Sequence, residues 1–417
     1  MSSIVLALKA KRSLDKMNLQ FILKLSAGLS FLFLSILILS GWGLSGGYIP
    51  SESEAFSSIL YLRKMGGVGQ MIRSLHFYLS SGLIISGFIF LMTFYLNGYT
   101  SQYWKQWVLS LSIYFLIIGS CFTGYLLPMD QNAFWGTQVR LGIVESVPVI
   151  GVWIANLLRG GSTIGSETLS RFITIHASII PIIVSIITLL LIQSQWEFIK
   201  TILSKTSILF GTIIGLVLIY FWTYSVSAPL ELPANPIDVD YTPRPEWYFL
   251  WLFEFGKYVE WAPWIRSALL PMAGTLFLLG LPFLKHQATN HRIGIAVSWC
   301  GTWLLLTSLT LYADRDLPEK LNYESAMFVQ AEENYQSLCY DCHGKEGKGD
   351  GPQTKTFSLE TPDFTSKTYW RGTDDDKILN AIKEGKGKDM PDFKRKLSKD
   401  QIYAQLEMMK ILFKPKK

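Results

Sequence analysis

The sequence is poor in charged residues, in cysteine and in histidine. Only 17% of its 417 residues are charged while 49% are hydrophobic, and the mean hydropathy is +0.27. This balance excludes a chain that is water-soluble throughout and indicates membrane helices joined to a soluble part. The formal charge of +6 is too small to indicate a nucleic-acid partner. Aromatic residues reach 14%, which is typical where Trp and Tyr occupy bilayer interfaces.

The four cysteines do not form the pattern of a disulfide framework. Cys121 and Cys300 stand alone in apolar stretches, where we interpret them as small packing residues. Cys339 and Cys342 form a CxxC pair that His343 follows directly. Two thiols at this spacing can form thioethers with the two vinyl groups of a haem, and the adjacent imidazole can then ligate the iron. A zinc or redox CxxC is the alternative, and the lack of a second cysteine pair disfavours it.

The region around the CxxCH motif resembles the single-haem class of cytochrome c. The similarity includes the glycine-rich GKEGKGDGP that follows the motif, Pro362–Phe364 and Lys388–Ile402. In that class a methionine before a proline is the second iron ligand, so the resemblance implies this role for Met390. The other methionines of the region are Met327, which lies too far upstream, and Met408 and Met409, which suit packing on a C-terminal helix.

Seven apolar stretches are long enough, at about 1.5 Å per residue, to cross a bilayer as helices. They are Leu19–Gly43, Gly69–Leu96, Trp107–Leu127, Ser170–Ile192, Ile208–Ser227, Arg266–Leu284 and Gly294–Tyr312. No small-residue cleavage site follows the basic segment 1–17, so we expect a retained first helix rather than a removed signal peptide. The stretch Pro128–Glu167 is too interrupted to span, and we expect it at the membrane interface.

The basic residues of the loops predict an orientation. If the N-terminus is cytoplasmic, then Lys105, the pair Lys200 and Lys205, and the pair Lys285 and Arg292 all lie in cytoplasmic loops, as basic residues usually do. The acidic loops and the CxxCH region then lie on the outer side. We therefore expect a multi-pass protein of the cell (inner) membrane with its C-terminal domain in the periplasm.

Two of the apolar stretches carry a single histidine near their first end, His76 in Gly69–Leu96 and His176 in Thr168–Ile192. An imidazole in hydrocarbon is costly unless something binds it, so both histidines are functional candidates. Side by side, the two helices would hold the imidazoles at one depth, on opposite faces of a flat cofactor such as haem. The alternative is two core histidines that bond to neighbouring helices.

Five stretches match one family: RSLH at 73–76, TGYLLPMDQ at 123–131, GIVESVPVIG at 142–151, LLRGGSTIGSETLSRFITIH at 157–176 and PEWYF at 245–249. They resemble cytochrome b of the quinol–cytochrome c oxidoreductases, and most of all the plastoquinol-type form, whose two pieces are joined here. The resemblance covers Leu19–Tyr312. It implies a mainly α fold, a seven-transmembrane-helix bundle with a four-helix haem-binding part and a three-helix part, followed by a small all-α cytochrome c domain. We expect these parts at 1–205, 206–315 and 326–417, with a linker at 316–325.

The loop that holds PEWY forms the outer quinol-oxidation pocket in this family. The resemblance therefore assigns the pocket to Pro245, Glu246, Trp247 and Tyr248. Glu246 would accept a quinol proton, since a carboxylate at the edge of an apolar pocket can be tuned as a base. Tyr125 would line the same pocket, and Met129 stands where the family usually has Trp or a small residue. The alternative for Glu246 is a helix cap or an ion pair near Arg244.

The family binds a second, inner haem with another histidine about 14 residues further along each of two helices, roughly 21 Å along the axis. Those positions hold Phe90 and Leu190, or Leu191 with the longer spacing of the split form, and none of these can ligate iron. The remaining histidines are His286 and His291, which lie in a loop.

Other positions agree that only the outer haem is kept. Gly41 and Gly124, which give the outer porphyrin clearance in the family, are present, and so is Arg73 beside His76. The matching inner positions hold Ala27, Ser110 and Thr93. Leu25 replaces the cysteine that holds an extra covalent haem in the split form.

The resemblance implies a membrane quinol oxidoreductase fused to its own cytochrome c acceptor, with one haem b, one haem c and quinol as substrate. Its implied partners are a Rieske iron–sulfur protein on another chain, a soluble or membrane electron acceptor, membrane lipid and a second copy in a homodimer. Without an inner haem we expect no standard Q cycle, so the low-potential electron needs another exit. The alternatives are a non-catalytic, membrane-anchored cytochrome c carrier with a degenerate b scaffold, and a further subunit that supplies inner haem ligands.

Overall fold

The structure is a computed structural model that describes residues 2–64, 67–194, 196, 199–200, 205–225, 227–238, 241–284, 288–316 and 323–415, without the side chains of 2–17 and of some residues near helix ends. The chain divides into two compact units, one of Met1–Ala228 with Pro233–Pro318 and one of Pro229–Leu232 with Glu319–Lys417. Most of the expected linker at 316–325, together with His286, lies outside the described residues.

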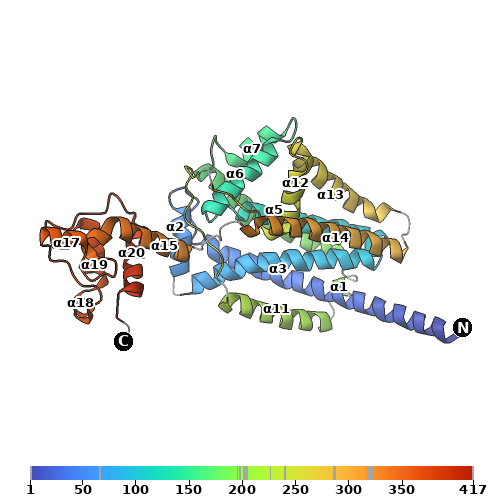
Figure 1. Cartoon of the computed structure of the whole chain (residues 1–417). Helices are drawn as coiled ribbons and strands as arrows, with labels where there is room; N and C mark the ends of the chain where they lie inside the picture. Colours follow the sequence, from blue (N-terminus) through green and yellow to red (C-terminus); the bar gives the residue numbers. More distant parts are fainter. Residues whose placement is uncertain are drawn as a thin grey trace. The chain divides into compact units, whose positions relative to one another are not determined.

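Helices make up most of the described part of the first unit (Figure 1). They are α1 Ser2–Ser45, α2 Ala55–Lys64, α3 Val68–Leu96, α4 Tyr99–Gln102, α5 Trp104–Gly124, α6 Gln131–Glu145, α7 Gly151–Arg159, α8 Ser166–Thr174, η1 Ile175–Ile179, α9 Ile180–Ser194, α11 Lys205–Ser225, η2 Trp247–Phe249, α12 Leu250–Lys257, η3 Ile265–Leu269, α13 Leu270–Gly280, η4 Leu281–Phe283, α14 Thr289–Ala313 and η5 Asp314–Asp316.

Helix α3 is the centre of this unit. It packs against α1, α5, α11 and α14, and α1 runs along its length in Figure 1. Half of its most apolar segment is buried, whereas no other long apolar helix has more than 17% of its segment buried. The other long helices therefore expose apolar side chains around the bundle, as helices in contact with lipid do.

Five helices in the described part of the chain are long and apolar enough to cross a membrane. They match five of the seven expected spans, and the shorter apolar helices Leu209–Phe221 and Leu270–Phe283 match the other two. The sequence did not predict α2 or α12, and the interrupted stretch Pro128–Glu167 forms α6 and α7. Asp130 begins α6, because its carboxylate accepts a hydrogen bond from the backbone of Ala133 at 2.9 Å.

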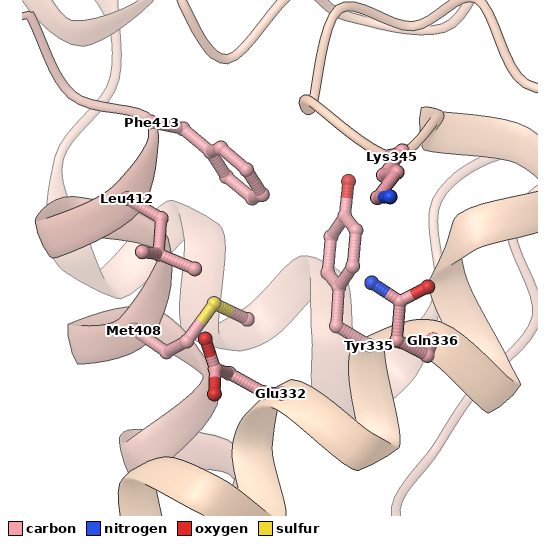
Figure 2. Close-up of a pocket in the computed structure, with 7 residues that line it drawn as sticks. All are labelled: Glu332, Tyr335, Gln336, Lys345, Met408, Leu412 and Phe413. Carbon is pink, nitrogen blue, oxygen red and sulfur yellow. The ribbon is translucent and has the colours of Figure 1, made fainter.

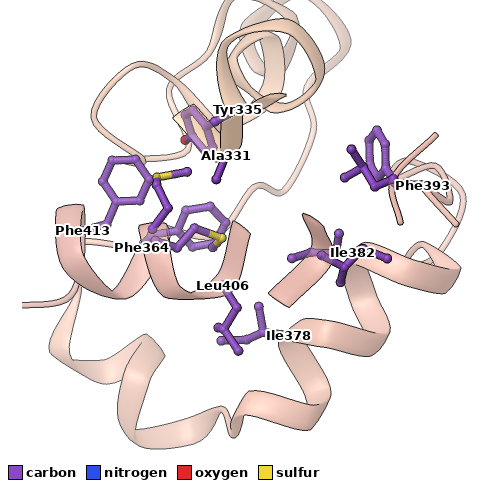
Figure 3. Close-up of a cluster of buried hydrophobic side chains, with 12 residues drawn as sticks. Ala331, Tyr335, Phe364, Ile378, Ile382, Phe393, Leu406 and Phe413 are labelled. Carbon is purple, nitrogen blue, oxygen red and sulfur yellow. The ribbon is translucent and has the colours of Figure 1, made fainter. Parts of the chain in front are cut away.

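The second unit has seven described helical segments around a single apolar core. They are α15 Tyr323–Asn334, η6 Tyr335–Cys339, α16 Tyr340–His343, α17 Pro352–Phe357, α18 Lys367–Gly372, α19 Asp375–Glu384 and α20 Lys399–Leu412. Figure 3 shows that the core joins Ala331 and Tyr335 to Phe364, Leu406 and Phe413. Helix α20 packs against both α15 and α19, so it ties the ends of the unit together.

Candidate functional site

The imidazoles of His76 and His176 face each other inside the first unit. His76 is on α3 and His176 is in the π-helical turn η1, which interrupts the α8–α9 helix. The two ring centroids are 6.0 Å apart and the ring planes meet at 72°. A single π-helical turn within an α-helix often marks a functional site, and here it carries the second imidazole.

Hydrogen bonds to a neighbouring helix orient both rings through Nδ1. Nδ1 of His76 lies 3.0 Å from the hydroxyl of Ser40 on α1. Nδ1 of His176 lies 2.9 Å from the carbonyl and 3.1 Å from the hydroxyl of Ser120 on α5. Bonding at Nδ1 leaves Nε2 as the ligand atom, which is the arrangement found around metal-bound histidines.

The spacing of the two rings fits one metal held between them. An imidazole nitrogen binds a metal at about 2.0–2.1 Å, so two imidazoles on opposite sides of one ion have ring centroids roughly 6 Å apart. The observed 6.0 Å agrees with this value. Two core histidines that merely bond to neighbouring helices would need no such facing arrangement.

Gly41 and Gly124 each lie against one imidazole. A Cβ atom at Gly41 would be 3.0 Å from Cε1 of His76, and a Cβ atom at Gly124 would be 2.5 Å from Cε1 of His176. Any larger residue at Gly124 would therefore displace the ring. The backbone of α1 approaches the His76 ring and that of α5 the His176 ring, which leaves the space between the imidazoles free of protein side chains from these two positions.

Arg73 lies one turn before His76 and is buried. Its guanidinium donates a hydrogen bond to the carbonyl of Ala228 at 2.9 Å, and the backbone N–H of Ala228 donates to the hydroxyl of Ser74 at 3.0 Å. The arginine thus connects the start of the His76 helix to the segment that follows α11.

The inner half of the bundle is filled by aromatic and aliphatic side chains. Phe90 and Ala27, which stand where the resemblance places an inner ligand and a glycine, both pack against a buried cluster that includes Phe94 and Trp107. The ring centroids of Phe94 lie 5.8 Å from Phe90 and 5.7 Å from Trp107. Trp107 is 2% exposed and donates a hydrogen bond to the carbonyl of Leu278 at 2.8 Å.

Leu190 and Thr93 are two further positions that the resemblance assigns to an inner site. Leu190, which stands where the resemblance places the second inner ligand, is 50% exposed on the outside of the described bundle. Thr93, which replaces the inner arginine, uses its hydroxyl within α3 to bond the carbonyl of Ile89 at 2.7 Å. Phe90 and Ala27 are thus packed against a buried cluster, whereas Leu190 lies at the surface of the described bundle.

The loop after α11 packs directly beside the imidazole pair. Trp247 donates a hydrogen bond to the hydroxyl of Ser81, five residues beyond His76, at 3.2 Å. Tyr125 follows Gly124 and donates a hydrogen bond to the carbonyl of Arg244 at 3.0 Å. Trp247 and Tyr248 both border the apolar cluster around Leu79 and Leu83 of α3. The structure therefore brings Tyr125 and Pro245–Tyr248 together next to the two histidines.

Glu246 is neither a side-chain cap nor the partner of Arg244. It stands immediately before η2, at the N-cap position, where its side chain makes no capping hydrogen bond. Arg244 forms an ion pair with Asp314 instead, with 2.7 Å between Nε and the carboxylate. Burial raises the pKa of Glu246, Arg140 opposes this effect, and Asp130 reinforces it. Such a carboxylate can take up a proton close to neutral pH more readily than an exposed glutamate.

Arg140 is a residue of this region that the sequence analysis missed. Its guanidinium lies 3.7 Å from the ring centroid of Tyr125 and 5.7 Å from that of Phe122. It therefore brings a positive charge to the aromatic side of the loop near Glu246. Only the fold brings α6 to this position, so no motif in the sequence could have indicated it.

The CxxCH residues of the second unit lie at the edge of its apolar core. Cys339 packs against the core, and the ring of His343 stacks on Phe364 with centroids 4.7 Å apart. Burial lowers the pKa of His343 to about 4, so its imidazole is neutral at physiological pH, as a metal ligand must be. Its Nδ1 is buried without a hydrogen-bond partner among the described residues.

Met390 borders the same core as Cys339. It is held by a tight turn in which Lys386 and Met390 exchange backbone hydrogen bonds of 3.0 and 3.3 Å. Gly385 makes this turn possible because its φ is +78° and a Cβ atom there would be 2.5 Å from the carbonyl of Met390. Neutral imidazole, thiols and thioether around one apolar core are a donor set that suits a covalently bound haem.

The other methionines of the second unit lie in its interior. Met327, Met408 and Met409 are 7%, 0% and 4% exposed. Met408 also lines a pocket of about 260 Å³ with Glu332, Tyr335, Gln336, Lys345, Leu412 and Phe413, shown in Figure 2. None of the CxxCH residues or Met390 lines that pocket, so it is separate from the proposed ligand set.

Comparison with known protein families matches two separate parts of the chain. Residues 13–198 match the family described as Cytochrome b/b6/petB, and residues 326–406 match the family described as Cytochrome C oxidase, cbb3-type, subunit III. The first match contains His76 and His176, and the second contains Cys339, Cys342 and His343.

Similar proteins include a "Cytochrome bc complex cytochrome b subunit" of Chlorobaculum thiosulfatiphilum, which is 29% identical over 69% of this chain and 73% of the relative. The "Menaquinol:cytochrome c reductase cytochrome b subunit" of Bacillus subtilis (strain 168) is 36% identical over 37% of this chain and 70% of the relative. Among solved structures, one titled "Hyperthermophilic respiratory Complex III" has a TM-score of 0.58 at 21% identity, covering 71% of this chain and 84% of that one. This last likeness concerns the fold alone.

Proposed function

The chain belongs to the cytochrome b/b6 family, and from this premise we propose that it is the cytochrome b/c subunit of a membrane complex that oxidises quinol. It is a multi-pass membrane protein whose mainly helical bundle is followed by a small helical domain similar to cytochrome c. The observation that carries the proposal is the facing pair of His76 and His176, 6.0 Å apart, directly beside the loop of Glu246.

In this proposal His76 and His176 hold one haem b, with Gly41 and Gly124 giving clearance and Arg73 supplying positive charge nearby. Cys339 and Cys342 hold one haem c covalently, with His343 and Met390 as the iron ligands. When bound, the two haems supply one-electron acceptors with different reduction potentials. The residues of the inner half supply no second pair of ligands, because Phe90 is packed and Leu190 is exposed.

The protein's own contribution to the reaction is to bind quinol and remove its protons. Trp247 and Tyr248 give the loop an aromatic wall, and Tyr125 holds the loop in place through the carbonyl of Arg244. Glu246 lies at the edge of this region with a raised pKa, and we assign to it the acceptance of one quinol proton.

We further propose the setting in which this subunit works. The relative in Bacillus subtilis is named as a menaquinol:cytochrome c reductase subunit, and this name supports quinol as the substrate. The resemblance to quinol–cytochrome c oxidoreductases supports a Rieske iron–sulfur protein as the partner. The N-terminus is proposed to be cytoplasmic, with residues 326–417 on the outer side and a homodimer as the working assembly. The standard Q cycle does not run in its usual form, since this chain offers no ligands for an inner haem.

Absorption spectra of membranes that contain only this protein test the proposal. After reduction, we expect b-type and c-type bands in about equal amounts. A c-type band alone would instead favour a non-catalytic, membrane-anchored cytochrome c carrier. Two b haems for each c haem in the purified complex would indicate that a further subunit supplies inner ligands.

Gly124→Ala is expected to weaken the retention of haem b. The added Cβ would be 2.5 Å from Cε1 of His176, and overpacking of this kind costs about 1–3 kcal/mol, or roughly 5- to 150-fold in binding. The b-type absorbance per polypeptide measures the effect. Gly119→Ala on the same helix is the control, because its Cβ would make only an ordinary contact at 4.0 Å with Ile180. Equal absorbance in the two variants would contradict the proposed role of Gly124.

Arg140→Gln is expected to move the acid limb of quinol oxidation to higher pH. Arg140 lowers the pKa of Glu246, so its removal lets that pKa rise further and leaves less of the carboxylate ionised at a given pH. The dependence of the initial rate on pH measures the shift. A shift to lower pH, or none, would contradict an ionised Glu246 as the proton acceptor.

Met390→Ala is expected to lower the midpoint potential of the c haem while leaving the haem covalently attached. A thioether ligand raises the reduction potential of a haem, and the alanine side chain offers no thioether at this position of the turn. Redox titration of the c-type band measures the change. The control is Met327→Leu, a conservative change of a core side chain. An unchanged potential in Met390→Ala would show that another residue ligates the iron.

A further inference from the structure

We propose that Ser40 and Ser120 are positioning residues for the two imidazoles, and that Ser40 in particular sets the reduction potential of the group they bind. The inference rests on the proposed function, in which His76 and His176 hold haem b. Each serine belongs to a neighbouring helix rather than to the helix of the histidine it contacts, so the contact fixes the ring relative to the bundle.

The hydroxyl of Ser40 connects His76 to the backbone of α1. Its Oγ lies 3.0 Å from Nδ1 of His76 and donates a hydrogen bond to the carbonyl of Leu37 at 3.2 Å. A hydroxyl that donates to a carbonyl has its lone pairs available, so it can accept the proton of Nδ1–H. Ser40 is only 7% exposed, so its hydroxyl is shielded from water.

His176 has a different support. Its Nδ1 lies 2.9 Å from the carbonyl of Ser120 and 3.1 Å from the hydroxyl of the same residue. Because a carbonyl can only accept, the ring must donate from Nδ1, which leaves the Nε2 lone pair for a metal. A substitution at Ser120 removes the hydroxyl but leaves this backbone carbonyl in place.

The serines and the glycines act on the same rings. Ser40 precedes Gly41, which contacts His76, and Ser120 lies one turn before Gly124, which contacts His176. On each side, one helix therefore provides both the space for the imidazole and the acceptor for its N–H. Two other serines of these helices bond within their own helix: Ser35 to the carbonyl of Phe31 at 2.8 Å and Ser112 to that of Val108 at 2.9 Å.

This arrangement predicts the direction of the effect on redox chemistry. An imidazole that donates a strong hydrogen bond from Nδ1 is a more basic ligand, and a more basic ligand favours oxidised iron. Loss of the Ser40 hydroxyl should therefore raise the midpoint potential of haem b. The change at Ser120 should be smaller, because the carbonyl at 2.9 Å remains as the acceptor.

The test compares Ser40→Ala, Ser120→Ala and Ser40→Thr in the full-length protein by redox titration of the b-type band and by electron paramagnetic resonance. The resonance spectrum reports the angle between the two imidazole planes, which is 72° in this structure. We expect Ser40→Ala to raise the midpoint potential of haem b. The rise is about 59 mV for each tenfold change in the ratio of the protein's affinities for oxidised and reduced haem. The affinity of the Ser40→Ala protein for haem b should fall roughly tenfold relative to the wild type. Ser40→Thr, which restores a hydroxyl, should return both readouts toward the wild type.

Ser35→Ala and Ser112→Ala are the matched controls and should behave as the wild type. An unchanged potential and spectrum in Ser40→Ala would overturn the inference. So would a Ser40→Thr protein that behaves like Ser40→Ala, because the effect would then come from packing and not from the hydroxyl. A wild-type protein without any b-type band would instead contradict the proposed function, so the two failures are distinguishable.

Discussion

Replacing His176 by leucine is expected to remove the b-type haem from the protein and to leave the c-type haem in place. His176 is one of the two imidazoles that face each other in the described bundle, and the other residues of its π-helical turn, Ile175 and Ala177–Ile179, could not substitute as a ligand. Leucine fills a similar volume, so the helix should still pack. A reduced-minus-oxidised spectrum of membranes measures both bands, and quinol oxidation should fall to the background rate.

The control for this change is His291→Leu. His291 is exposed at the start of α14 and makes no contact with the imidazole pair, so both bands should remain. A b-type band of normal height in His176→Leu would show that haem b is held elsewhere, and it would remove the basis of the proposed function.

Glu246→Gln is expected to slow quinol oxidation by about 10²–10⁴-fold while both haems stay bound. The amide keeps the shape of the side chain but cannot accept a proton at neutral pH. Burial already raises the pKa of Glu246, and Arg140 keeps it from rising further, so the ionised form is available as a base. The rate of quinol-dependent reduction of the c haem in the complex with its iron–sulfur partner measures the effect.

Glu260→Gln provides the comparison, because Glu260 is an exposed carboxylate in the turn after α12. Its rate should equal that of the wild type. Unchanged turnover in Glu246→Gln would exclude Glu246 from the mechanism, and the proton would then have to leave through another group of the loop.

The sequence predicted the long helices and the identity of the residues that face each other, because these depend on local patterns. An uninterrupted apolar stretch with one histidine indicates a membrane helix with a functional residue, and the CxxCH motif is short and specific. The fold class follows from these patterns and agrees with the helical structure and its likeness to a respiratory complex III structure.

The contacts that orient the site could not be predicted in the same way. Ser40 and Ser120 look like ordinary small residues of an apolar helix, and Arg140 lies in a stretch without a recognisable motif. Ser40 and Ser120 lie 36 and 56 positions from the histidines that they contact, and Tyr125 lies 119 positions from Arg244. These pairs meet only because the helices pack together. Local propensity carries no information about such pairs.

The inner half of the bundle shows what the sequence alone can predict and what it cannot. The absence of histidine at Phe90 and Leu190 can be seen in the sequence alone. That Phe94 and Trp107 fill the neighbouring space, and that Leu190 faces outward, depends on the tertiary packing. The packed core supports the interpretation that one haem site of the related fold has been lost.

The number of porphyrins per polypeptide tests this interpretation most directly. Haem extracted from the purified protein, with the non-covalent and covalent forms measured separately against polypeptide mass, should give one haem b and one haem c. A second haem b on this chain would contradict the account, because it would require ligands in the half of the bundle that we describe as closed.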